Sequence, residues 1–138
     1  MNATVWLSRL LAIGAVLEIP VGLGLLIIPS PLSMLLLGAP LSGIGLVVAR
    51  LGGGGLLALG IACWFARSTP TARAGLGVAA ALLTYNVIAC VTLVLAAISL
   101  GTRALTLGVA VLHGLLAVGL LGALVVGTRQ LSSTVRRI

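Results

Sequence analysis

Residues 74–102 read AGLGVAAALLTYNVIACVTLVLAAISLGT, and no charged side chain interrupts them between Arg73 and Arg103. About 20 apolar residues suffice for a helix to cross the hydrocarbon core of a bilayer. The stretch is rich in Leu and Ala, and it lacks the sustained alternation of apolar and polar residues that marks a membrane β-strand. It therefore predicts one membrane-spanning helix.

The composition of the whole chain supports this interpretation. Of the 138 residues, 61% are hydrophobic and only 7% are charged, whereas soluble domains carry about 25% charged residues. This excludes a soluble globular enzyme, a disordered tail and a disulfide-stabilised secreted module, because too little polar material exists to cover a folded surface in water. The chain is expected to be an all-α integral membrane protein that contacts the lipid bilayer.

Four spans are predicted, and prolines separate the first two. Pro29, Pro31 and Pro40 interrupt a long interval without arginine, and proline breaks helices because it removes a backbone donor and clashes with the preceding turn. The expected spans are residues 6–28, 42–66, 74–99 and 104–127. Residues 31–38 are apolar but too short to cross, so we expect a short interfacial or re-entrant segment there. With no long linker or clear repeat, residues 1–138 are expected to form one four-helix antiparallel bundle.

The arginines act as topology signals rather than as a nucleic-acid surface. The net charge is +7, but the arginines stand singly between apolar runs, so no nucleic-acid partner is predicted. Four spans place both chain ends on one side, and more arginines fall on that side than on the opposite one. They are Arg9, Arg67, Arg73, Arg129, Arg136 and Arg137, against Arg103 alone. The positive-inside tendency then predicts that both termini are cytoplasmic.

Each predicted span contributes one strongly polar side chain, namely Glu18, Arg50, Asn86 and His113 in chain order. A rise of about 1.5 Å per residue places all four roughly 12 to 18 Å from the outer ends of their spans. An ionisable group that faced lipid at this depth would cost several kcal/mol, so the four are expected to face inward and to meet. Glu18 and Arg50 are interpreted as an ion pair, and Tyr85 adds a hydroxyl group beside Asn86.

This polar layer has a functional and a structural interpretation. In the first, it binds a proton, a polar headgroup or a small lipophilic, quinone-like molecule. Glu18 would then act as acceptor, Arg50 as counter-charge, Asn86 as the orienting group and His113 as the partner that titrates near neutral pH. In the second, it only fixes the packing of an accessory or assembly subunit, alone, as a homo-oligomer or in a larger membrane complex.

Catalytic and metal chemistry have less support in the sequence. An enzyme that used Glu18 and His113 as acid and base would lack an evident nucleophile, and a catalytic zinc site needs three protein ligands. Cys63 and Cys90 are interpreted as small core hydrophobes, because both lie in apolar stretches without a CxxC motif. No cofactor or metal is predicted.

Two backbone features are expected to shape the bundle. Residues 52–55 are four consecutive glycines, which either pack tightly against a neighbouring helix or break the span. Pro20 cannot donate to the carbonyl of Val16, so it is expected to kink the first span and to add a free carbonyl to the polar layer.

Three strings in the first half of the chain carry a family resemblance. They are Ser8-Arg9-Leu10-Leu11 at the start of the first span, residues 29–38 before the second, and GGGLLALG at residues 53–60 within it. In these strings and in its general form the chain resembles the DoxX-like group of small bacterial four-helix membrane proteins. The resemblance implies a multi-pass protein of the bacterial inner (cytoplasmic) membrane, and some members of the group are linked to quinone-reducing membrane complexes.

Overall fold

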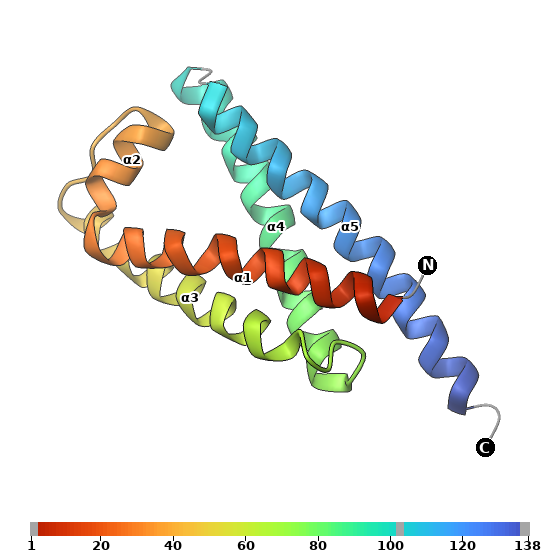
Figure 1. The fold of residues 1–138 in the computed structure, drawn as a ribbon. Coiled ribbons are helices and arrows are strands. Elements are labelled where there is room, and N and C mark those ends of the chain that lie inside the picture. The colour runs from red at the N-terminus through yellow and green to blue at the C-terminus, as the bar shows by residue number, and fades with distance from the viewer. Residues whose placement is uncertain (1–2, 102–103, 136–138) are drawn as a thin grey trace.

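The computed structural model describes residues 3–101 and 104–135, with side chains described as far as Thr128. These residues form five helices, α1 (Ala3–Ile27), α2 (Pro29–Leu37), α3 (Ile44–Ala66), α4 (Arg73–Leu100) and α5 (Ala104–Val135) (Figure 1). The all-α prediction is confirmed for this part of the chain. Four helices, α1, α3, α4 and α5, are long and apolar enough to cross a membrane, which indicates a multi-pass membrane protein.

The helix boundaries follow the breaks that the sequence predicts. Between α1 and α2, Ile28 leaves the helical conformation with φ −128° and ψ 56°, and Pro29 opens α2, where its missing N–H group is not needed. The short segment expected at 31–38 is thus a nine-residue helix. Gly38 ends it in the left-handed conformation, with φ 78°, and its N–H group donates to the carbonyls of Ser33 and Met34.

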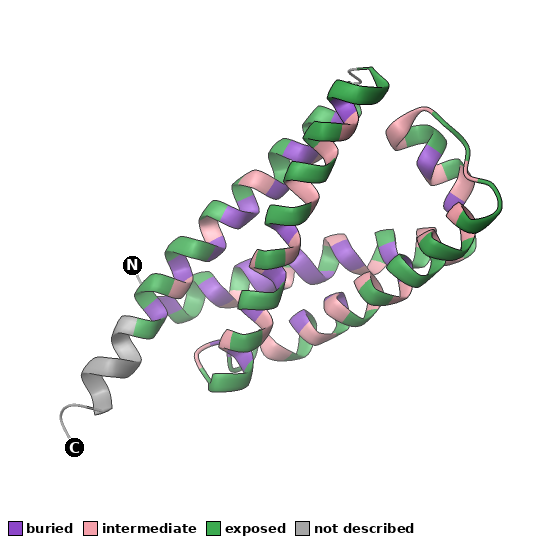
Figure 2. Cartoon of the chain, turned by 180° about the vertical axis from the view of Figure 1, so that it is seen from behind, coloured by how far each residue is buried: buried purple, intermediate pink, exposed green. Residues whose placement is uncertain are grey.

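The long helices associate as two pairs, α1 with α3 and α4 with α5. Along the first pair, Gly22 contacts Gly53 and Leu57, while Ile19 contacts Gly60, so α1 and α3 run in opposite directions. The two pairs lie close together near the ends of the described chain and diverge towards the end that holds α2 (Figure 1). Buried residues are concentrated along the inner faces, and the outward faces are largely exposed (Figure 2).

The core where the pairs meet is aliphatic and depends on glycine. Leu7, Leu11, Leu82 and Leu120 are fully buried and belong to one cluster. On α5, an added Cβ atom at Gly119 or Gly127 would lie 3.4 Å from Leu10 or 3.3 Å from Leu7 of α1, respectively. Small residues on α5 therefore let α1 approach closely, as expected for helices that associate in lipid.

The glycine run in α3 is neither a break nor a uniform packing surface. The helix continues through it from Ile44 to Ala66. Only Gly53 faces α1, where an added Cβ atom would lie 2.8 Å from the Gly22 carbonyl oxygen, whereas nothing lies within 4 Å at Gly52, Gly54 or Gly55. Tight packing accounts for one of the four glycines.

One expectation is corrected by the structure, and another rests partly on residues that the structure does not describe. Pro20 lies inside α1, but it and Val16 are exposed on the outer face, so the Val16 carbonyl is not added to the buried layer. The topology prediction also used residues that the structure does not describe, Arg103, Arg136 and Arg137, and the undescribed side chain of Arg129.

Candidate functional site

Glu18 lies in the core of the molecule, with 2% of its surface exposed. It shares one face of α1 with Gly14 and Gly22, four residues to either side, which contact Leu82 of α4 and the backbone of α3. At Gly60 of α3, an added Cβ atom would lie 3.3 Å from the Cβ atom of Glu18. Glycines on two helices therefore hold the only acidic side chain of the protein at a close helix contact.

The carboxyl group of Glu18 is incompletely satisfied. It makes a side-chain hydrogen bond with the Tyr85 hydroxyl of α4. Its Oε1 atom is buried without a hydrogen-bond partner, and among the described side chains none forms an ion pair with it. A buried carboxylate with one donor and no counter-charge is energetically unfavourable, so this group is the unusual feature of the site.

Asn86 and His113 form the second half of the site. The Asn86 Oδ1 atom lies 2.8 Å from His113 Nδ1, and the Asn86 Nδ2 atom donates to the Leu82 carbonyl at 2.8 Å. The Leu82 carbonyl can only accept, so the amide must present its oxygen to the histidine. His113 therefore carries a proton on Nδ1, and in the neutral ring Nε2 is left as an acceptor.

Tyr85 connects the two halves. Its ring packs edge-on against the His113 ring, with the centroids 5.6 Å apart and the planes at 85°. Tyr85 and Asn86 are adjacent on α4, and they contact α1 and α5 respectively. Glu18, Tyr85, His113 and Asn86 are therefore one continuous group, which we call the polar cluster, and the structure brings together four of the five predicted site residues.

Arg50 is the exception, and its predicted pairing with Glu18 is not formed. Its side chain is exposed, and Nε donates to the Leu26 carbonyl at the end of α1, with a distance of 3.3 Å. Leu26 lies eight residues beyond Glu18, which corresponds to about 12 Å along the helix. The physical reason is that α3 begins at Ile44, so Arg50 lies in its second turn, close enough to the helix end to reach unpaired carbonyls there.

Cys63 of α3 was not predicted to lie at the site. It is fully buried and belongs to the core cluster, as its interpretation as a small hydrophobe requires, and it lies one helical turn after Gly60, which contacts Glu18. Gly60 and Cys63 are three residues apart and so share one face of α3. The spacing shows that the two residues share a face, and only the structure shows that this face meets α1. Each of the four long helices thus contributes to the site.

The polar cluster is closely packed and shows no metal geometry. No group of three His, Cys, Asp or Glu side chains within the described ranges could hold a metal ion. Two surface hollows are lined by apolar or small residues, and neither is lined by a residue of the polar cluster. The polar cluster is therefore better suited to binding a proton than to enclosing a larger ligand.

Comparison with known proteins adds no family to this description. No protein-family model, curated protein or solved structure matches the chain. The resemblance to DoxX-like proteins therefore stays a prediction, and the function has to be argued from the polar cluster.

Proposed function

We propose that the chain is a four-span membrane protein with both ends in the cytoplasm, in which Glu18 binds and releases a proton. The observation that carries the proposal is the buried, unpartnered Oε1 atom of Glu18. An ionised carboxylate at this depth would cost several kcal/mol without a counter-charge. A proton on the carboxyl group removes this cost, so the charge of the site then depends on pH.

The neighbours of Glu18 fit this role. Tyr85 donates a hydrogen bond that also supports the ionised form, so both protonation states have a partner. His113 is held by Asn86 with Nε2 as an acceptor, and imidazole is the side chain that exchanges protons near neutral pH. In this proposal Glu18 is the proton-binding group, His113 its exchange partner, and Tyr85 and Asn86 position them.

A quinone-like molecule or a polar headgroup is the alternative ligand, and DoxX-like membership in a bacterial inner membrane would favour it. The close packing of Glu18 and Asn86, both 2% exposed or less, supports the proton instead. The accessory-subunit hypothesis treats the same contacts as packing only. It predicts that the protonation state of Glu18 does not change under conditions in which the protein is folded.

Infrared difference spectroscopy on the protein in lipid nanodiscs tests the proposal directly. Glu18 is the only acidic side chain in the chain, so a protonated-carboxyl stretching band that the parent shows and Glu18→Gln lacks can be assigned to Glu18 rather than to lipid esters or the scaffold protein. The spectrum should show this band at neutral pH, and the band should change reversibly over about pH 5 to 8, the range in which imidazole also titrates. Glu18→Gln provides the matched control, because it keeps the size of the side chain and removes the band.

Two results would contradict the proposal. A carboxyl that stays ionised throughout this range would mean that the buried charge is compensated in another way. A band that persists unchanged at every pH would mean a permanently neutral, structural group. Adding a water-soluble quinone analogue to the same samples tests the alternative ligand. Only the quinone hypothesis expects the carboxyl band to shift at constant pH.

A further inference from the structure

A hollow on the outer surface of α1 and α3 has no role in the polar cluster. Its lining consists of Ala15, Val16, Ile19 and Pro20 from α1 and Trp64 from α3, and its volume is about 380 Å³. Every lining side chain is apolar. In a membrane this surface faces acyl chains, so an aliphatic chain matches it chemically.

A cation contacts Trp64, one of the residues that line the hollow. The guanidinium carbon of Arg67 lies 3.8 Å above the centroid of the Trp64 ring, in a cation–π contact. The Arg67 Nε atom is buried without a hydrogen-bond partner among the described residues. The aromatic ring thus connects an apolar surface on one side to a fixed, partly unsatisfied cation on the other.

The position of Arg67 just after an apolar helix leads us to expect this cation at headgroup level. Arg67 is the first residue after α3, whose span ends at Ala66, and Trp residues favour the membrane interface. Guanidinium groups bind phosphate through a planar fork of N–H donors. The chain carries a net charge of +7, which adds attraction for an anionic rather than a neutral partner.

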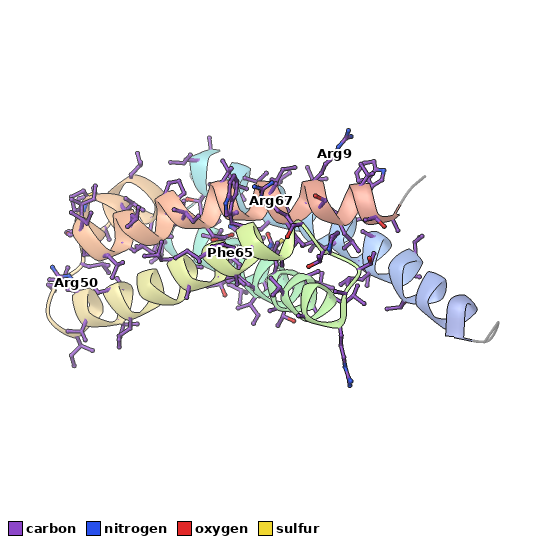
Figure 3. All side chains as sticks on the ribbon, turned by 60° about the horizontal axis from the view of Figure 1, so that its bottom comes forward. Arg9, Arg50, Phe65 and Arg67 are labelled. Atoms are coloured by element: carbon purple, nitrogen blue, oxygen red, sulfur yellow. The ribbon has the colours of Figure 1, made fainter. Side chains whose placement is uncertain are left out.

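We propose that the hollow and Arg67 together bind one anionic phospholipid. An acyl chain lies along Val16, Ile19 and Trp64, and the headgroup phosphate accepts hydrogen bonds from Arg67. Two other described arginines are arranged differently. Arg50 lies at the opposite end of α3 from Arg67, and Arg9 extends away from the helices (Figure 3). The proposal does not depend on the protonation of Glu18.

Native mass spectrometry of the detergent-solubilised protein tests the site with defined lipids. The probes are phosphatidylglycerol and phosphatidylcholine with identical acyl chains, and glycerol phosphate, which has no chain. The parent protein should retain one phosphatidylglycerol in preference to phosphatidylcholine, and Arg67→Gln should reduce that preference about fivefold, the effect of roughly 1 kcal/mol per basic residue near anionic lipid. Glycerol phosphate should not bind measurably.

Two further variants distinguish binding at this site from a general attraction of anionic lipid to the positively charged protein. Arg9→Gln removes the same charge from an exposed position away from the hollow, so phosphatidylglycerol retention should stay at the parental level. Val16→Trp fills the hollow from an exposed position and should reduce retention of both lipids. Equal losses in Arg9→Gln and Arg67→Gln would overturn the proposal, and so would unchanged retention in Val16→Trp. Binding of glycerol phosphate that equals phosphatidylglycerol would assign Arg67 to a free phosphate instead.

Discussion

At the scale of single residues, one backbone carbonyl determines which ring nitrogen of His113 carries the proton. Leu82 accepts the Asn86 amide N–H group, so the Asn86 oxygen faces His113 and fixes the proton on Nδ1. A histidine held in this way keeps Nε2 available on the other edge of its ring. Asn86 is therefore more than a contact between helices, because it selects the tautomer of the histidine that we propose as the proton-exchange partner.

The pairing of Asn86 with His113 predicts a specific pattern of stability. His113→Leu should destabilise the protein by about 1–3 kcal/mol, because it leaves the buried Asn86 oxygen without a donor. Adding Asn86→Leu should recover part of this loss, since replacing both partners by apolar groups removes the unsatisfied atom. Thermal unfolding of both single variants and the double variant in detergent measures the pattern. Additive losses would show that the hydrogen bond contributes nothing to stability.

The position of Arg50 predicts that its substitution and that of Glu18 affect stability independently. Glu18→Gln and Arg50→Gln should have additive effects on unfolding, to within roughly 0.5 kcal/mol, because the side chains share no partner and lie more than 10 Å apart along α1. The same unfolding assay provides the double-mutant cycle. A coupling energy well above that value would place the two charges together and would contradict the contact of Arg50 with Leu26.

These two pairs show how far sequence could predict the site. Counting residues from the span ends placed Glu18, Asn86 and His113 at one depth, and they do lie in one group. The same count failed for Arg50, because depth along a helix does not describe where a long side chain reaches. Cys63 was missed for a different reason. Its place beside Glu18 depends on which face of α3 meets α1, and a single sequence leaves that open.

At the scale of the helices, α1 and α3 pack through glycine backbones rather than through interlocking side chains. Gly22 and Gly53 lie opposite one another, and each would place an added Cβ atom within 3 Å of the other helix's backbone. Prolines and arginines were enough to predict most helix ends to within a few residues, because each acts on its own segment, but α5 continues to Val135, beyond the predicted end of its span at residue 127. Of residues 52–55, Gly53 alone continues the four-residue spacing of Gly45 and Ala49, which predicts a helix contact, and it is the glycine that meets α1.

Alanine substitutions along the glycine run should therefore have opposite effects. Gly53→Ala should destabilise the protein, because the added methyl group would lie 2.8 Å from the Gly22 carbonyl oxygen and would force the helices apart. Gly52→Ala and Gly54→Ala meet nothing within 4 Å and should stabilise it by up to about 1 kcal/mol through helix propensity. Unfolding in detergent compares them. A loss at Gly52 or Gly54 equal to that at Gly53 would point to a partner molecule on the open face.

At the scale of the whole molecule, the two helix pairs meet near the chain ends and separate towards α2 (Figures 1 and 2). The polar cluster connects the pairs, because Glu18 belongs to one pair and Asn86 and His113 to the other. The Thr106 hydroxyl of α5 also donates to the Leu36 carbonyl of α2 at the diverging end. A change in how the pairs approach one another would therefore also change the contacts of the polar cluster.

The orientation of this arrangement in the membrane can be predicted from charge and tested with introduced cysteines. Ser68 is exposed in the loop between α3 and α4, and Ser99 is exposed near the opposite end of α4. Because arginines are enriched on cytoplasmic segments, Ser68→Cys should react with a membrane-impermeant maleimide only from the cytoplasmic face, and Ser99→Cys only from the other. Cys63→Ala and Cys90→Ala supply a cysteine-free background. Reaction of both positions from one face would contradict a membrane-crossing α4, whereas the reverse assignment would preserve the fold and invert its orientation.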